Sequence, residues 1–138
     1  MAPGLIALAA ALAIAVATGL AWRWNSGRMR RSASDATRLI TAAELGGPLG
    51  QRATLVQFST AFCTPCRATR LILAEVAGMT DGVTHVEIDA ESHLDLVRRL
   101  DIRRTPTVLV LGPDGRIATR ASGQPRKADV IAALGSTS

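Results

Sequence analysis

Residues 59–73 read STAFCTPCRATRLIL and contain both cysteines of this 138-residue chain, Cys63 and Cys66, three positions apart. Two cysteines placed at random over such a length would fall at this spacing in roughly one or two cases in a hundred, so the spacing requires a cause. The pair is a reactive dithiol, half of a metal site, or an incidental pair in a core. Two cysteines are too few for a multi-disulfide secreted framework or a four-thiolate zinc site.

The cysteines lie between a predicted strand and a predicted helix. Residues 53–60, ATLVQFST, are β-branched and apolar over most of their length, which is typical of a buried central strand. After the cysteines, apolar side chains recur every three or four positions and predict a helix that ends near Gly78. Its expected buried face consists of Ala68, Leu71, Ile72, Val76 and Met79.

The junction between strand and helix predicts the chemistry of the pair. Pro65 is tolerated there because first-turn amides have no helical partner to lose. Free N–H groups and the positive end of the helix dipole stabilise a thiolate at Cys63, so its pKa is expected below the free-thiol value of about 8.5. Cys66, one turn further in, is expected to be more buried, and the spacing lets it displace a group attached to Cys63.

Two other interpretations of the pair stay open at this point. One is a purely structural disulfide or two core thiols. The other is a metal-binding module, which needs two further ligands, and the histidines His85 and His93 have no spacing that brings them to the thiols. We therefore expect no metal, and we expect His93 on the surface.

The rest of the folded region alternates predicted strands and helices. Residues 38–45 predict a brief strand running into a helical turn, and residues 83–89, 107–112 and 116–122 predict strands, the last two joined by a hairpin turn at PDG. Residues 92–102 predict a helix with Ser92 as N-cap and with Leu94, Val97 and Leu100 on one face. Residues 125–134 predict a final helix with Pro125 in its first turn. This order gives an α/β fold with a mixed central sheet and helices on both faces.

Together these motifs resemble the thioredoxin family. FSTAFCTPCRATRLILAEVA is followed at the family's distances by VTHVEID, IRRTPTVLVLGPDG and SGQP, and the resemblance covers about Arg38 to Leu134. It implies a thioredoxin-like fold and dithiol–disulfide exchange with protein substrates through Cys63 and Cys66. It also implies no bound cofactor, and a recycling reductase or other electron donor as a partner.

The resemblance further implies a substrate-binding surface. Thr105–Pro106 would be a cis-proline pair, with Pro106 packed against the dithiol and the Thr105 backbone binding an extended substrate segment. Thr64 and Pro65, between the cysteines, complete the candidate substrate-binding residues.

Several positions depart from the family's pattern. Gln57 fills the position of a buried Asp that helps to move the proton of the second cysteine, which Gln cannot do. His85 fills the position of a partly buried Lys, so proton transfer is expected to rest on His85 or on water, and Gln57 and His85 are the two positions of a candidate proton relay. His85 also fits a half-exposed strand residue. The aromatic pair beside the motif is reduced to Ser59 and Phe62, and the helix proline is absent at Leu71.

The N-terminal segment predicts a single membrane anchor. Residues 2–22 carry no ionisable side chain, and 21 residues at about 1.5 Å each reach roughly 30 Å, the thickness of a hydrocarbon core. Trp22 and Trp24 follow at the level of an aromatic belt. A cleaved signal peptide is the alternative, with residues 15–17 resembling a cleavage site, but MAPG has no Lys or Arg. We expect an anchor over 1–24, a flexible basic linker over 25–37 and a thioredoxin-like domain over 38–138.

Charge indicates orientation and excludes one class of partner. Residues 1–37 hold four arginines and one Asp, and all four arginines follow the apolar run. This placement favours a single-pass cell-membrane protein whose domain is cytoplasmic, with an extracytoplasmic domain as the alternative. The remaining 12 basic and 10 acidic residues leave the domain at only +2. Without a basic groove and interleaved aromatics, no nucleic acid is expected. The arginines at 98, 99, 103 and 104 are expected on a solvated helix face and loop, with a docking patch as the alternative.

The resulting hypothesis is a membrane-tethered thiol-disulfide oxidoreductase that reduces protein disulfides, with membrane lipid, protein disulfide or dithiol substrates and a reductase as partners. The competing hypothesis is a non-catalytic membrane-bound binding module of the same fold, in which the pair is a redox-switched latch or a metal-holding site.

Overall fold

The computed structural model describes residues 2–137, and within them the domain is built on a four-stranded sheet of order β2-β1-β3-β4. The strands are β1 (Ala53–Ser59), β2 (Val83–Asp89), β3 (Thr107–Leu111) and β4 (Ile117–Ser122). β1 pairs with β2 in parallel, and the β1/β3 and β3/β4 pairs are antiparallel. The sheet is therefore mixed, as the sequence predicts.

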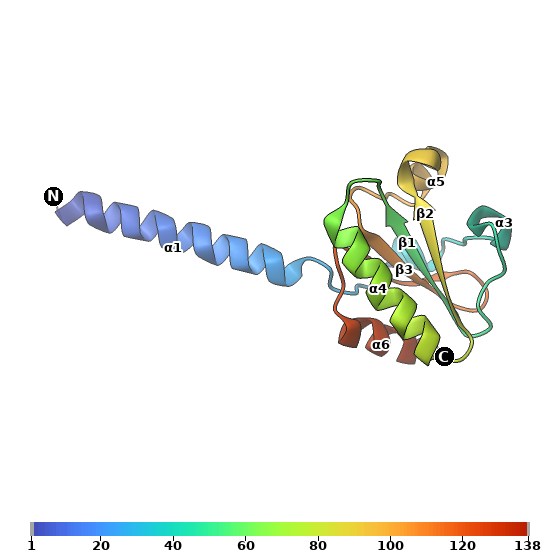
Figure 1. The fold of residues 1–138 in the computed structure, drawn as a ribbon. Coiled ribbons are helices and arrows are strands. Elements are labelled where there is room, and N and C mark those ends of the chain that lie inside the picture. The colour runs from blue at the N-terminus through green and yellow to red at the C-terminus, as the bar shows by residue number, and fades with distance from the viewer. Residues whose placement is uncertain (1, 138) are drawn as a thin grey trace.

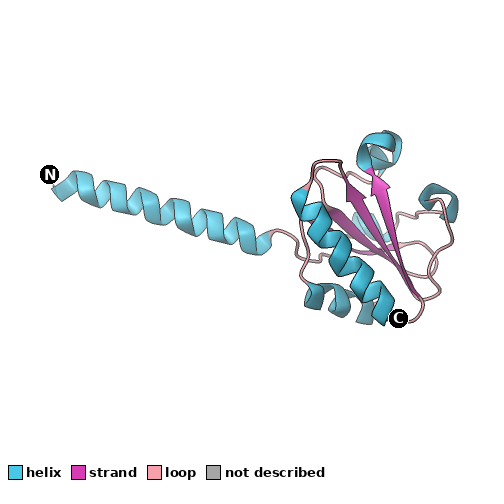
Figure 2. Ribbon diagram, in the orientation of Figure 1, coloured by secondary structure: helices cyan, strands magenta, loops and turns pink. Residues whose placement is uncertain are grey.

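Helices cover both faces of this sheet (Figures 1 and 2). One face packs against α4 (Thr64–Met79) and α6 (Lys127–Gly135), through a core that includes Leu55, Leu73 and Val130. The other face packs against α3 (Ala42–Leu45) and α5 (Leu94–Arg99), which follows the 3-10 turn η1 (Ala90–Ser92). Because β1 is buried along its whole length, the cysteine loop that follows it is held by a rigid central strand.

The predicted buried face of α4 is only partly correct. Val76 is buried and Ile72 packs against the core, but Leu71 and Met79 are 72% and 60% exposed. The buried side chains of the helix are Cys66, Thr69, Leu73 and Val76. These four follow a 3-4-3 spacing that starts at the second cysteine, so the packing of Cys66 sets the phase of the stripe. The sequence pattern misleads because apolar side chains continue past that stripe onto the exposed face.

Two other helix predictions also need correction. Leu94 is 53% exposed, and α5 buries Leu96 in its place, whereas the predicted Leu100 is buried at the C-cap and Val97 packs against the core. Ser92 is not the N-cap of α5, because it closes the preceding turn by donating to Asp89 Oδ2 at 2.8 Å. The last helix begins at Lys127, after its N-cap Arg126. Pro125 is thus in the preceding loop rather than in the first turn.

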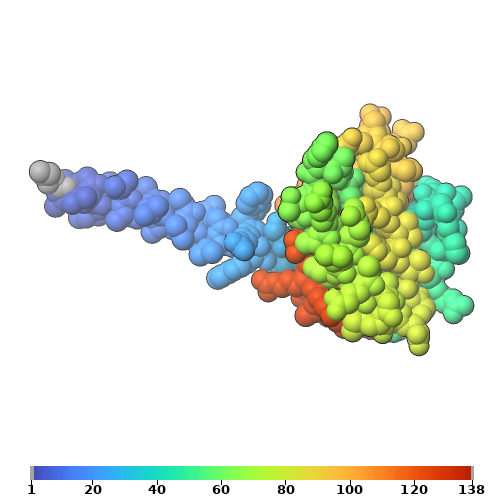
Figure 3. All heavy atoms as spheres, viewed as in Figure 1, coloured from blue at the N-terminus to red at the C-terminus, as the bar shows by residue number. Residues whose placement is uncertain are grey.

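The N-terminal helix α1 (Ala2–Asn25) extends away from the domain, and none of its residues is buried (Figures 1 and 3). Its length and composition are sufficient to cross a membrane once. A single apolar helix near the N-terminus is a candidate membrane span or a signal sequence.

The segment after α1, predicted as a flexible linker, is hydrogen-bonded to the edge of β4. Gly27 N donates to Ser122 O at 2.8 Å, and Arg30 and Arg120 exchange backbone hydrogen bonds of 2.7 and 2.8 Å. Within the segment lies α2 (Ala33–Ala36), whose buried Asp35 accepts two hydrogen bonds from the Arg120 guanidinium at 2.8 and 2.9 Å. The division of the chain at residues 24 and 37 stays a prediction.

Candidate redox site

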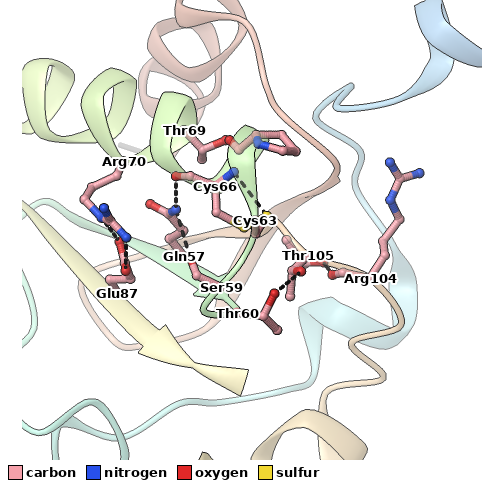
Figure 4. Close-up of a disulfide and its surroundings, with 12 residues drawn as sticks. Gln57, Ser59, Thr60, Cys63, Cys66, Thr69, Arg70, Glu87, Arg104 and Thr105 are labelled. Atoms are coloured by element: carbon pink, nitrogen blue, oxygen red, sulfur yellow. Dashed lines mark hydrogen bonds and ion pairs between the residues drawn. A yellow bond between two sulfur atoms is a disulfide. The ribbon is translucent and has the colours of Figure 1, made fainter. Parts of the chain in front are cut away.

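Cys63 and Cys66 form a disulfide at the N-terminus of α4, with the sulfurs 2.08 Å apart (Figure 4). Cys63 is the N-cap of the helix, and its Sγ accepts a hydrogen bond from Cys66 N at 3.2 Å. Cys66 is buried, 1% exposed, whereas Cys63 is half-buried. This is the predicted placement at the strand–helix junction, with Cys66 more buried than Cys63.

The electrostatic environment of Cys63 favours negative charge. The first turn of α4 contains no acidic side chain, so the positive end of the helix dipole is not compensated there. In the dithiol state the same Cys66 N–H would face the Cys63 sulfur. A sulfur in this position is suited to attack as a thiolate and to leave as one.

Gln57 contacts the helix turn that carries Cys66. Its side chain is fully buried, and Nε2 donates to the Cys66 carbonyl at 2.8 Å and to Ser59 Oγ at 3.0 Å. The carbonyl can only accept, so the amide orientation is fixed, and Oε1 faces His85 Nε2 at 3.1 Å. His85 therefore carries a proton on Nε2.

Burial lowers the pKa of His85 below its ordinary value. The nearby Glu87 carboxylate raises this pKa and the Arg70 guanidinium lowers it, but burial has the largest effect. Arg70 and Glu87 form a bidentate ion pair, with N–O distances of 2.5 and 2.7 Å, and this pairing raises the pKa of Arg70. The structure thus brings Gln57 and His85 together as a hydrogen-bonded pair. The pair ends at the backbone carbonyl of Cys66, and its role as a proton relay stays a prediction.

Thr105 lies beside the disulfide (Figure 4), and its peptide bond to Pro106 is cis, as the resemblance implies. Thr60 Oγ1 and Thr105 Oγ1 are 3.2 Å apart, and the buried Pro106 accepts from Gly123 N at 2.7 Å. Among residues 2–137, the backbone N–H and C=O of Thr105 have no hydrogen-bond partner. They are free to pair with an extended chain, as an exposed strand edge does.

The residues next to Cys63 in the loop are exposed. Phe62 is fully exposed, and Thr64 and Pro65 are exposed on the same loop. A shallow hollow of about 290 Å³ lies beside Thr105, with Leu94 and Thr60 among its lining residues. Sequence reasoning missed Leu94, which it assigned to the core, and no local signal distinguishes a groove leucine from a core leucine.

No group of three or more His, Cys, Asp and Glu side chains suited to a metal ion occurs in the described part of the chain. His93 is exposed, and its Nδ1 lies 3.0 Å from the Asp89 carbonyl rather than near the thiols. His85 contacts Gln57.

Comparison with known proteins agrees with this geometry. The thioredoxin family model matches residues 43–136. Thioredoxin H5 from Oryza sativa subsp. japonica is 32% identical over 57 residues, which are 41% of this chain and 42% of that protein, so the match spans less than half of the curated relative.

Solved thioredoxins share the fold. Chloroplastic thioredoxin z is 27% identical, with a TM-score of 0.57 over 63% of this chain and 79% of that one. Reduced Schistosoma mansoni thioredoxin pre-protein is 18% identical, with a TM-score of 0.56 over 64% and 82%. A mutant thioredoxin from Halobacterium salinarum is 21% identical, with a TM-score of 0.57 over 63% and 75%. The chain belongs to the thioredoxin family.

Proposed function

We propose that this protein is a membrane-tethered thiol-disulfide oxidoreductase that reduces protein disulfides through Cys63 and Cys66. The observation that supports this most directly is the Cys63–Cys66 disulfide at the N-terminus of α4, with Cys63 half-buried and Cys66 buried. A purely structural disulfide gains nothing from an uncompensated helix N-terminus and an adjacent free backbone at Thr105.

The reaction proceeds in two exchanges. The Cys63 thiolate attacks one sulfur of a substrate disulfide, the substrate S–S bond breaks, and a mixed disulfide forms while one substrate thiolate leaves. Cys66 then loses its proton and attacks the Cys63 sulfur, which forms the Cys63–Cys66 bond and releases the second substrate thiolate. Two electrons pass from the dithiol to the substrate, so a reductase or other donor must return two electrons to the protein.

Thr64, Pro65, Thr105 and Pro106 form the proposed substrate surface. The unpaired Thr105 backbone binds the substrate segment as a short added strand, and Pro106 shapes the surface against the disulfide. The hydrogen-bonded Gln57 and His85 lie behind Cys66. An amide cannot carry the proton of Cys66, so we assign Gln57 to holding the helix turn and leave proton transfer to His85 or water.

α1 supplies the tether. Its apolar length and the absence of any buried residue along it support a membrane span, and the arginines that follow it favour a domain on the cytoplasmic side. A cytoplasmic domain fits the reducing direction, because cytoplasmic thiols are kept reduced. An outward-facing domain would act on exported thiol proteins instead.

Turnover of a generic protein disulfide by the full chain in detergent tests the proposal. We expect reduction of the substrate in the presence of a small dithiol donor, and its loss in the Cys63→Ser variant. Turnover that is absent in the wild type or unchanged in the variant would favour the non-catalytic module, for which the replacement of the family's buried Asp by Gln57 is the supporting observation. Labelling of Cys63 in intact cells with a membrane-impermeant thiol reagent would overturn the cytoplasmic orientation.

A further inference from the structure

A hollow of about 210 Å³ lies where the C-terminal end of α1 meets the domain. Its lining comes from α1, from the segment that follows it, from β4 and from the loop before Thr105. Trp22 and Asn25 line it, and its lining within residues 2–137 includes no carboxylate. Four arginines also line it: Arg28, Arg30, Arg104 and Arg120.

The positive charge of this hollow is only partly neutralised. Arg120 is paired with Asp35 behind the hollow, at 2.8 Å. Arg30 donates to the neutral side-chain oxygen of Asn25. Arg28 and Arg104 form no ion pair with any residue in the described range, so the hollow attracts an anion that the chain itself does not supply.

The position of the hollow indicates the source of that anion. The Arg104 guanidinium lies 5.8 Å from the centre of the Trp22 ring, which fixes the hollow at the level of this tryptophan. Trp22 follows the uncharged apolar run, at the depth where aromatic side chains meet lipid head groups if α1 spans the membrane. The phosphate groups of a bilayer lie at the same depth.

We propose that this hollow binds the phosphate of an anionic phospholipid, with Arg104 and Arg28 as the principal contacts. The proposal rests on the proposed membrane tether. Lipid binding here has a consequence for the redox site, because Arg104 adjoins Thr105 in the chain. Next to the hollow, Gly27 N donates to Ser122 O and Gly123 N donates to Pro106 O. A lipid held here keeps the side of the domain that carries Thr105 toward the bilayer.

The test uses the full chain in nanodiscs of equimolar phosphatidylcholine and phosphatidylglycerol. The lipids that stay bound after release are counted by native mass spectrometry. We expect the wild type to retain phosphatidylglycerol preferentially. Each arginine near a charged membrane surface contributes about a factor of five, so the double variant Arg28→Gln, Arg104→Gln is expected to lower that preference roughly twenty-five-fold.

The double variant Arg52→Gln, Arg98→Gln is a control with the same change of charge. Both arginines are exposed on other parts of the domain, and neither forms an ion pair within residues 2–137. We expect it to retain phosphatidylglycerol as the wild type does. If the first double variant does not fold, Trp22→Leu removes the ring beneath Arg104 while keeping α1 apolar, and we expect it also to weaken retention.

Equal loss in the control and in the Arg28 and Arg104 variant would overturn the site, because net charge alone would then explain retention. Displacement of phosphatidylglycerol in detergent by inorganic phosphate at a concentration no higher than that of the lipid would overturn the lipid as the occupant, because the rest of the lipid would then add nothing to binding. A chain that enters nanodiscs but retains both lipids equally would overturn the site alone, whereas a chain that never enters them would overturn the tether as well.

Discussion

Replacement of Gln57 by Leu should destabilise the domain by about 2–3 kcal/mol. The buried amide donates to the Cys66 carbonyl and to Ser59 Oγ and accepts from His85. Leucine removes all three hydrogen bonds, and a buried polar group left unpaired costs about 1–3 kcal/mol. The Cys66 carbonyl loses its side-chain partner without access to water, whereas half-buried His85 can turn to solvent, and the added apolar burial of leucine offsets part of the cost.

Thermal unfolding of the full chain in mild detergent measures this loss. For a domain of this size, about 2–3 kcal/mol corresponds to a fall in Tm of roughly 8–20 °C. Gln51→Leu is the matched control, because Gln51 is exposed and its replacement should change stability by less than about 0.5 kcal/mol. A Gln57→Leu protein that melts with the wild type would refute the assignment of Gln57 as the group that holds the Cys66 turn.

Three further outcomes follow from the same structure. Because the pKa of His85 is lowered in the folded protein, the unfolded chain binds a proton there first as the pH falls. The free energy of unfolding should therefore decrease as the pH drops through 6.5 and level off below the folded pKa. Denaturant titrations across this range should show that His85→Gln removes this pH dependence. Asp35→Ala leaves the largely buried Arg120 guanidinium without its carboxylate, and we expect a loss of about 2–4 kcal/mol by chemical denaturation; an unchanged midpoint would show that the segment after α1 contributes nothing to the fold. Arg70→Gln removes an ion pair with Glu87 that is open to solvent, and differential scanning calorimetry should detect no appreciable change in Tm.

Local pattern and family resemblance predicted the framework well. The apolar run at 53–60, the cysteine spacing and Pro65 locate the strand–helix junction, and the structure has β1 and α4 there. The cis bond before Pro106 came from resemblance, since no local property of the residues shows it.

What failed depends on contacts between distant residues. The buried face of α4 depends on how Cys66 packs against the sheet. The sequence pattern does not show this, because Leu71 is apolar yet exposed. The stacking of Arg104 on Trp22 joins positions far apart in the chain, and neither residue carries a local signal for the other. The orientation of the Gln57 amide is likewise decided by the Cys66 carbonyl rather than by sequence.

The most direct measurement on the redox site is to trap its intermediate. In a Cys66→Ser protein the second exchange cannot occur, so the full chain incubated with a disulfide-containing protein should accumulate a covalent complex. Peptide mass spectrometry should place the linking bond at Cys63, and a reductant should release the partner. A complex that forms equally well with the Cys63→Ser protein, linked through the buried Cys66, would contradict the assignment of Cys63 as the attacking sulfur.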